Sequence, residues 1–391
     1  MQSEYLHIIF ILSFGAILMS YLFYPILCIA VAKVIKKKNY AAYHPSVTIV
    51  CAAYNESSII RAKLDSLLRS NYDRSKLEIL IGDDGSTDGT DKIIDDVQKL
   101  FDHVKLVPFN GRNGKPKIIE TLTAQAKGEI IISTDANIIF DKDTIKLLVA
   151  PFHDEKIGLV DTIIKSNDSN KEGIAKQEQS YIGLEADLKH AEGKVFGAMM
   201  GPFGACFAIR KSLYKPLPAN FLVDDFHICM NILKDGYKAI SIKEAIVFEE
   251  VATELKEEIR RKTRIATGNI QNLFFFKSLW LNPFSKTFIP FVFHKVLRWF
   301  VPIFLILALI SNCLLYLQLP SDPMIRILLI CQLLLYIGSL FDLILQKIGI
   351  HTVFLRYISH FLGMNWALLL GFIRYFKGVK TNVWEPTKRN Q

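Results

Sequence analysis

The sequence predicts an α/β domain with a mostly parallel sheet, flanked at both ends by apolar segments long enough to cross a membrane. The chain has 391 residues, of which 51% are hydrophobic and 22% charged, and the apolar residues gather at the two ends. Between them, short β-branched runs alternate with longer amphipathic runs. Such alternation is typical of strands and helices that form a parallel sheet covered on both faces.

The first apolar segment, residues 5–34, is almost free of charge and is followed by lysines at 36–38. A cleavable signal peptide instead carries basic residues before a shorter apolar run, so residues 1–38 are interpreted as a transmembrane anchor. Basic residues beside a span stay in the cytoplasm, and the chain that follows is expected there. They also explain the net charge of +9 without a nucleic-acid partner, since the sequence has no basic stripe with interleaved aromatic residues.

Three further apolar runs form the predicted C-terminal membrane region, residues 300–376: 300–319, 325–345 and 354–376. Each is close to the length of about 20 residues that a spanning helix needs. Residues 284–299 mix apolar and basic side chains, which suits a helix in the membrane interface. One anchor and three later spans would place the basic tail, residues 377–391, outside, against the tendency of basic segments to stay inside. Either the tail breaks this rule or one closing segment does not span.

The middle of the chain, residues 45–283, carries the predicted α/β domain. The predicted strands are 47–52, 77–82, 104–108, 130–134 and 157–164, and the predicted helices are 57–70, 91–101, 116–126 and 141–149. Ligands bind beyond the carboxyl ends of the strands in such sheets, so polar residues that directly follow a strand are candidates for a site. The six cysteines are too scattered to indicate a zinc site or a disulfide framework.

Polar residues follow each of the first two predicted strands. Tyr54 and Glu56 come after the first strand and could contact a base and a ribose, although the same segment would also start a helix. Asp83 and Asp84 follow the second strand, before a loop of small residues at 85–90. A turn with a helix cap would not need two adjacent carboxylates, so these acids are interpreted as contacts to the uracil and ribose of a nucleotide.

The third and fourth predicted strands also end in candidate ligand groups. Lys115 lies in a glycine-containing basic segment, residues 110–117, that opens a helix and could bind a diphosphate. The sequence has no Walker-type motif that would support ATP hydrolysis. Asp135 and Asn137 follow the fourth strand and could hold one Mg²⁺ or Mn²⁺, because both ions prefer oxygen ligands. The alternative for Asp135 is a capping role for the helix at 141–149.

In this order, these segments resemble the nucleotide-binding half of a family 2 glycosyltransferase of GT-A fold, and the resemblance extends over about residues 45–276. The flanking spans are similar to those of membrane members such as cellulose, chitin, hyaluronan and poly-N-acetylglucosamine synthases. The resemblance implies a UDP-sugar donor, Mg²⁺ or Mn²⁺, and a glycan or lipid-linked glycan acceptor. It also implies a multi-pass protein of the bacterial inner membrane with a cytoplasmic catalytic domain, for which an accessory export subunit is a further candidate partner.

Later residues resemble the acceptor side of that family. Asp225, which follows Asp224, matches the position of the general base of an inverting transfer, and residues 201–206 resemble the segment that lines the acceptor site. Arg261 and Arg264 match the two basic positions of the motif written Q/R-x-x-R-W. The resemblance implies that these arginines contact the phosphates of the leaving nucleotide.

Two residues depart from the family pattern. Ile265 stands in place of the tryptophan of the arginine motif, and Asn137 in place of the second aspartate of the metal pair. The first departure favours transfer of a single sugar to a lipid-linked acceptor over the main expectation, a polymerising synthase. A nucleotidyltransferase lacks support, because the first strand is not followed by a glycine-rich loop with a basic residue. A non-catalytic scaffold or transporter would not need Asp135, Asp225 and Arg264 together.

Overall fold

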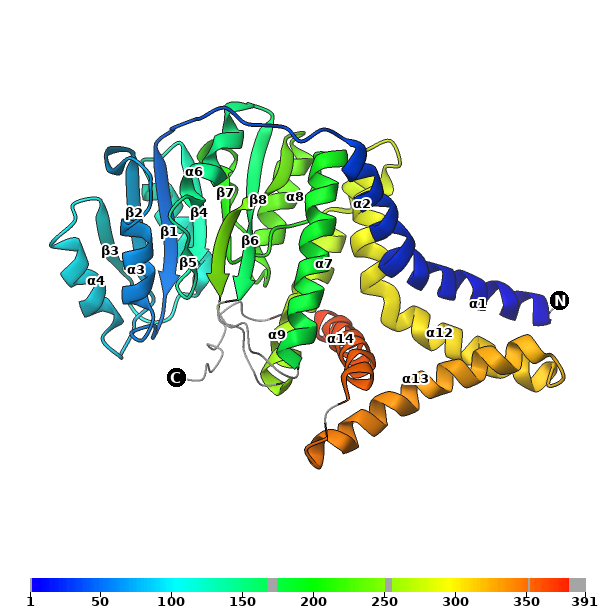
Figure 1. Ribbon diagram of the computed structural model, residues 1–391. Coiled ribbons are helices and arrows are strands. Elements are labelled where there is room, and N and C mark those ends of the chain that lie inside the picture. The colour runs from blue at the N-terminus through cyan, green and yellow to red at the C-terminus, as the bar shows by residue number, and fades with distance from the viewer. Residues whose placement is uncertain (1, 167–173, 250–254, 351, 380–391) are drawn as a thin grey trace. The chain divides into compact units, whose positions relative to one another are not determined.

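The computed structural model describes residues 2–166, 174–249, 255–350 and 352–379. The chain, drawn in Figure 1, divides into two compact units. The sheet unit consists of Val31–Ser169, Glu185–Ala252 and Val379–Gln391, and the helical unit consists of Met1–Ala30, Asn170–Leu184 and Thr253–Gly378.

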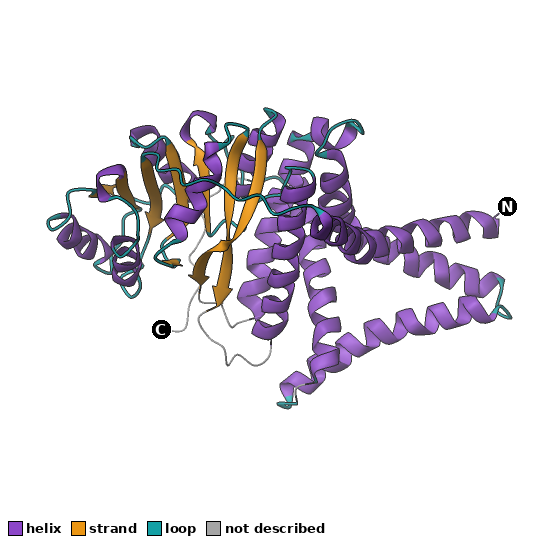
Figure 2. Ribbon diagram, turned by 45° about the horizontal axis from the view of Figure 1, so that its top comes forward, coloured by secondary structure: helices purple, strands orange, loops and turns teal. Residues whose placement is uncertain are grey.

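The sheet unit contains an eight-stranded sheet in the order β3-β2-β1-β4-β7-β6-β8-β5, drawn in orange in Figure 2. The strands are β1 Val47–Ala53, β2 Leu77–Asp83, β3 Val104–Pro108, β4 Ile130–Asp135, β5 Ile139–Phe140, β6 Ile157–Ser166, β7 Cys206–Arg210 and β8 Lys238–Glu249. The strands β3, β2, β1 and β4 run parallel, as the sequence predicts. The other half is mixed, because β7 is antiparallel to both β4 and β6 whereas β6 and β8 are parallel. The short β5 pairs antiparallel with β8.

Helices connect and cover these strands. They are α3 Ile60–Leu68, α4 Thr90–Gln98, α5 Lys115–Gln125, α6 Thr144–Val149, α7 Ile174–Val195 and α8 Asp224–Lys234, with short 3₁₀ turns at Arg74–Lys76, Ala150–His153 and Lys211–Leu213. The five predicted strands and four predicted helices are all confirmed, with bounds that differ by three residues or fewer. The strands β5, β7 and β8 and the helices α7 and α8 were not predicted.

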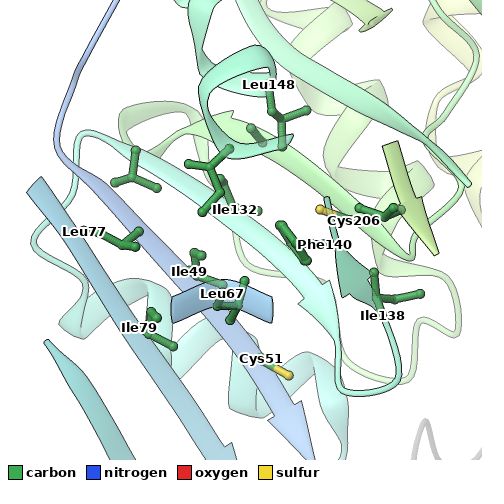
Figure 3. Packing of buried hydrophobic residues seen from close by; sticks show 14 of the residues in the cluster. Ile49, Cys51, Leu67, Leu77, Ile79, Ile132, Ile138, Phe140, Leu148 and Cys206 are labelled. Carbon is green, nitrogen blue, oxygen red and sulfur yellow. The ribbon is translucent and has the colours of Figure 1, made fainter. Parts of the chain in front are cut away.

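Both faces of the parallel half are buried. Successive side chains of a strand point to opposite faces, so each strand places apolar residues on both sides of the sheet. Ile49, Ile79 and Ile132 belong to one cluster with Leu67 of α3, as Figure 3 shows. On the opposite face, α5 packs so closely that a Cβ atom on Gly82 would overlap the side chain of Ile118. Nearly continuous apolar strands are therefore required here.

The register brings the carboxyl ends of three strands to one edge of the sheet. Ala53 at the end of β1 pairs with Asp83 of β2, and Ala52 pairs with Asp135 of β4. The backbone N–H of Asp135 also donates to the carbonyl of Ala205, at 3.0 Å, just before β7. This edge therefore collects the polar residues that follow β1, β2 and β4.

Among the described residues, four helices are long and apolar enough to cross a membrane: Ser3–Val34, Phe288–Gln318, Pro323–Lys347 and Val353–Phe376. All of them belong to the helical unit except Val31–Val34 at the end of the first. The elements are α1 Gln2–Leu18, a π-helical turn at Met19–Phe23, α2 Tyr24–Val34, α9 Leu255–Phe275, α10 Lys277–Leu281, α11 Phe288–Pro290, a second π-helical stretch at Phe291–Val296, α12 Leu297–Gln318, α13 Pro323–Lys347 and α14 Val353–Phe376. Most of the predicted interfacial segment, residues 284–299, runs without a break into α12.

Candidate active site

A pocket opens at the carboxyl edge of the parallel strands. Its walls come from four segments of the sheet unit: Ala52, Ala53, Tyr54, Glu56, Asp84, Arg112, Lys115, Ile118, Asp135, Ala136 and Asn137. Six site residues that the sequence predicts are among them, namely Tyr54, Glu56, Asp84, Lys115, Asp135 and Asn137. The pocket arises because parallel strands end together and their following loops turn toward the same side.

Asp84 is the residue that orders the pocket wall after β3. It is buried and accepts hydrogen bonds from the backbone N–H groups of Asn113, at 2.6 Å, and Gly114, at 3.1 Å. The Nε of Arg112 donates to the same carboxylate at 3.1 Å. Gly114 has a φ of 86°, a conformation that favours glycine. Asp84 therefore fixes the segment from which α5 begins.

Asp83 has a different place from its neighbour, since adjacent residues at a strand end face opposite ways. It does not line the pocket. Its Oδ2 accepts the backbone N–H of Ser86 at 3.0 Å, and its buried Oδ1 has no hydrogen-bond partner among the described residues. Asp83 thus closes the turn after β2.

Tyr54 and Glu56 are held in place by the loop of small residues after β2. The hydroxyl of Ser86 accepts the N–H of Asn55, and the hydroxyl of Thr90 accepts the N–H of Glu56, both at 2.9 Å. Arg112 lies over the Tyr54 ring, with its Cζ 3.4 Å from the ring centroid. The predicted stacking surface of Tyr54 is therefore covered on one side by a cation that the sequence analysis did not single out.

Lys115, the first residue of α5, connects the two halves of the site. Its Nζ lies 2.6 Å from Oδ1 of Asp135 and 4.0 Å from Oδ2 of Asp224, the first residue of α8. Burial disfavours the ammonium, but the charges of Asp135 and Asp224 outweigh it and raise the pKa of Lys115. Lys115 is thus a fixed cation between the strand that carries the predicted metal ligand and the helix that carries the predicted base.

Asp225 faces the loop that precedes β7. Its Oδ1 accepts the N–H of Phe226 at 2.6 Å, and a Cβ atom on Gly204 would overlap its Oδ2. Gly204 also has a φ of 82°, so only glycine allows this approach without strain. Burial, and then the Asp224 carboxylate, raise the pKa of Asp225. A raised pKa suits a group that takes up a proton during a reaction.

The residues at the end of β4 fit a divalent cation that also binds a substrate diphosphate. Asp135 is partly exposed and supplies a carboxylate, and the amide nitrogen of Asn137 lies 3.3 Å from Oε1 of Glu249, which leaves the amide oxygen for a cation. The described residues contain no group of three or more His, Cys, Asp or Glu side chains that could hold a metal. Mg²⁺ is commonly bound by one or two carboxylates together with substrate phosphates. Asp135 does not cap α6, whose N-cap is Asp143.

Arg261 and Arg264 lie on α9 in the helical unit. The pocket lies in the sheet unit, so the predicted contact of these arginines with a leaving nucleotide stays a prediction. Both side chains make interactions within the described chain.

Lys63 of α3 is a buried cation near the site that the sequence analysis missed. Its Nζ donates to the hydroxyl of Thr134 at 2.9 Å and lies 4.2 Å from the centroid of the Phe140 ring. Burial lowers the pKa of Lys63 to about 8. The signal in the sequence was a lysine at an apolar position of an amphipathic helix.

Comparisons with known proteins agree with this geometry. The family model described as Glycosyl transferase family 2 matches residues 48–217. The chain carries a family 2 glycosyl transferase domain. The matched range of this domain includes the pocket residues Tyr54, Asp84, Lys115 and Asp135, and it ends before Asp225.

Relatives of the family 2 domain bear the names of sugar transferases. A probable glycosyltransferase YdaM of Bacillus subtilis is 28% identical over 237 residues, which are 58% of this chain and 55% of the relative. An N-acetylglucosaminyltransferase of Neorhizobium galegae is 24% identical over 242 residues, with the same shares. The chain thus spans about half the length of these relatives. The poly-beta-1,6-N-acetyl-D-glucosamine synthase of Staphylococcus aureus is 32% identical over 115 residues, 29% of this chain and 27% of the relative.

A solved structure shares the fold along almost the whole chain. The mannosyltransferase PcManGT from Pyrobaculum calidifontis, in complex with GDP-Man and Mn²⁺, has a TM-score of 0.69 and 22% sequence identity. The likeness covers 96% of this chain and 99% of that chain. The GT-A fold of the family 2 domain is therefore confirmed.

Asp84→Asn should loosen the pocket wall of the family 2 domain. An amide offers one acceptor oxygen instead of two, so a buried backbone donor at Asn113 or Gly114 loses its partner, at a cost of about 1–3 kcal/mol. We expect amide hydrogen exchange of residues 110–114 to become about 10- to 100-fold faster. Asp96→Asn removes an exposed carboxylate of α4 and serves as the control. Equal exchange in Asp84→Asn and wild type would contradict this assignment.

Proposed function

We propose that the chain is a membrane-bound inverting glycosyltransferase that transfers a sugar from a UDP-sugar to a growing polysaccharide. The observation that supports this most is the convergence of Asp135 and Asp224 on Lys115 beside a pocket at the carboxyl edge of the sheet. This arrangement places anions and a cation where a nucleoside diphosphate and its metal can bind. A structural scaffold would gain nothing from grouping these charges, because burying charges costs free energy.

The donor nucleotide would occupy the pocket after β1 and β2. Tyr54 and Glu56 would contact the base and ribose, and Asp84, at the wall of the same pocket, would lie beside them. Lys115 would contact the diphosphate. A cation held by Asp135 and the Asn137 oxygen would act as a Lewis acid toward the leaving diphosphate when bound. Arg261 and Arg264 are proposed to add planar contacts to the same phosphates.

Asp225 would act as the general base. The acceptor oxygen forms a bond to the anomeric carbon of the sugar, the bond from that carbon to the diphosphate breaks, and the acceptor proton passes to Asp225. The raised pKa of this carboxyl strengthens it as a base, and the glycine at 204 leaves Oδ2 room beside the acceptor loop. The charge of Lys115 would stabilise the departing diphosphate.

Two observations bear on the product. The hypothesis that the chain synthesises a polymer agrees with the name of the Staphylococcus aureus relative, a poly-beta-1,6-N-acetyl-D-glucosamine synthase, and with the four apolar helices. Single transfer to a lipid acceptor agrees with Ile265 and with the name of another relative, a beta-monoglucosyldiacylglycerol synthase of Nostoc, 31% identical over 118 residues. Product length with a labelled donor separates them, since a polymerase yields a ladder and a single transferase yields one band.

The location proposed is the bacterial inner membrane with the family 2 domain in the cytoplasm. The lysines at 36–38 after the first apolar helix support this orientation. The identity of the donor is tested by incubating the purified full chain with a panel of UDP- and GDP-sugars. Consumption of GDP-sugars alone would contradict the proposal that the donor is a UDP-sugar.

Asp225→Asn should bind the nucleotide as the wild type does but lose transfer by about 100-fold or more, because an amide cannot accept the proton. Turnover and UDP affinity are measured on the same preparation. Since the folded pKa of Asp225 is raised, the wild-type rate should fall as pH drops through a value above about 3.9, the ordinary aspartate pKa. Near-wild-type turnover by Asp225→Asn would remove Asp225 from the base role.

Chelation should stop transfer if the leaving diphosphate needs a metal. We expect EDTA to abolish turnover and an excess of Mg²⁺ or Mn²⁺ to restore it. In Asp135→Asn, more Mn²⁺ should be needed for half-maximal rate than in wild type. Undiminished turnover in EDTA would exclude the metal from the mechanism.

A further inference from the structure

A second group of charged side chains is buried in the sheet unit, behind the loop that Asp225 faces. Asp161 on β6 is 1% exposed and Lys189 on α7 is 4% exposed. Neither residue belongs to a motif of the sequence or to the walls of the pocket. Buried charges are costly unless they are compensated, so this pair requires an explanation.

Both side chains hold the loop that precedes β7. Oδ2 of Asp161 accepts the backbone N–H of Phe203 at 3.2 Å, and the Lys189 Nζ lies 3.6 Å from the centroid of the Phe203 ring. On its other side the same loop contacts α8, since Cβ atoms on Gly201 and Gly204 would overlap Phe226 and Asp225. The loop is therefore clamped between the buried pair and the proposed base.

The pair also contributes to the electrostatic environment of Asp225. The groups that act on Asp161 are Lys189 on α7, Asp225 and Cys229 on α8, and Cys206 on β7. Burial raises the pKa of both cysteines to about 12, so they are neutral at physiological pH. Burial likewise raises the pKa of Asp161 to about 7, against the effect of Lys189. The charged groups around Asp225 are Asp224, Lys115, Lys189 and Asp161.

We propose that Asp161 and Lys189 are positioning residues for sugar transfer, which hold the loop at 201–205 against Asp225 and set the charge behind the base. This rests on the proposed function. Lys189 favours the ionised base, and Asp161 is protonated through the acidic range in which Asp225 titrates, so the charge behind the base there is that of the lysine. If Lys189 were only a structural clamp, its loss would not change the pH at which the base ionises.

The test compares pH–rate profiles of Lys189→Met and Asp161→Asn in the full chain. Loss of the lysine should move the acidic limb of the profile to higher pH, by on the order of half a pH unit. Asp161→Asn should leave the limb in place, because the carboxyl that it replaces is protonated below about pH 7. Lys243→Met and Asp187→Asn remove the members of an exposed ion pair on β8 and α7 and should leave the limb unchanged. A limb that stays in place in Lys189→Met, or that moves in Asp161→Asn, would overturn the proposal.

A second readout needs no substrate. Because the folded pKa of Asp161 is raised, the folded state binds more protons than the unfolded state between about pH 4 and 7, and stability falls as pH rises through that window. Asp161→Asn should flatten this fall in thermal unfolding followed by tryptophan fluorescence. If the wild type consumes no donor, the proposed function fails. Separately, a dependence of stability on pH in Asp161→Asn equal to that of the wild type would show that Asp161 does not hold a proton in the folded protein, and would overturn this part of the proposal.

An independent observation concerns α14 in the helical unit. The helices α12 and α13 are antiparallel neighbours, since Asn312 donates to Gln332 and the Tyr336 hydroxyl donates to the carbonyl of Leu305, both at 3.4 Å. The start of α12 and the end of α13 therefore lie on the same side of the membrane. A helix that crossed the membrane after α13 would end beside the turn at 319–322.

The contacts of α14 instead place both of its ends on the side of the membrane where α12 starts and α13 ends. Near its start, Arg356 lies 3.5 Å from Asp342 at the end of α13. Near its end, the ring centroids of Phe372 and Phe300 are 5.2 Å apart, and Phe300 belongs to the first turn of α12. A Cβ atom on Gly371 would overlap Ala266 of α9, a helix with five basic and two acidic residues that hydrocarbon would not accept.

We infer that α14 lies along the membrane interface and binds lipid headgroups, so that the chain has three spans. Its exposed side chains fit this surface: Phe354, Tyr357, Trp366 and Phe376 are aromatic, and Arg374 and Lys377 are basic. Three spans also keep the basic tail inside. This inference rests on the membrane anchoring under the proposed function, and not on its chemistry.

Reporters fused to the full chain after Gln391 test it in bacteria. A green fluorescent protein should fluoresce and alkaline phosphatase should be inactive there, whereas phosphatase inserted in the turn at 319–322 should be active. An active phosphatase after Gln391 would show that α14 crosses, and an inactive phosphatase at both positions would overturn the three spans.

Discussion

The ionic contact of Lys115 with Asp135 and Asp224 is the interaction on which the site depends. It joins the end of β4 to the start of α8, two segments that are 89 residues apart in the chain. Two carboxylates in a partly buried position repel each other, and the ammonium between them removes most of that cost. Lys115 in turn is placed by the segment that Asp84 holds. The position of Lys115, and with it the geometry of the site, therefore depends on buried Asp84 and on the loop that Asp84 holds.

Much of the nucleotide side could be predicted from the sequence, because parallel strands end at one edge and their loops must meet there. Tyr54, Asp84, Lys115 and Asp135 come from the ends of four separate strands and line a common pocket. The distinction between Asp83 and Asp84 was available in principle, since adjacent residues of a strand face opposite sides. Both acids were predicted to contact the nucleotide, and only Asp84 reaches the pocket.

Other residues could not have been found in this way, because their positions depend on the mixed half of the sheet. Glu249 meets Asn137 only because β8 returns beside β5, and Asp161 meets Phe203 only because β6 pairs with β7. No spacing in the sequence encodes these pairings. A lone buried lysine such as Lys189 also gives no pattern, since helices place long basic side chains on many faces. The acceptor side is therefore defined by topology, whereas the nucleotide side is defined by local motifs.

Lys115 is the cation shared by Asp135, on the nucleotide side of the site, and Asp224, beside the proposed base. This shared role is tested most directly by comparing Lys115→Met with Lys117→Met, a substitution at an exposed lysine two residues further along α5, in transfer from the donor that the wild type uses. The account predicts that Lys115→Met loses transfer by about 100-fold or more, in line with removal of a preorganised charge, while Lys117→Met keeps the wild-type rate. Comparable rates in the two variants, with both folded, would contradict it.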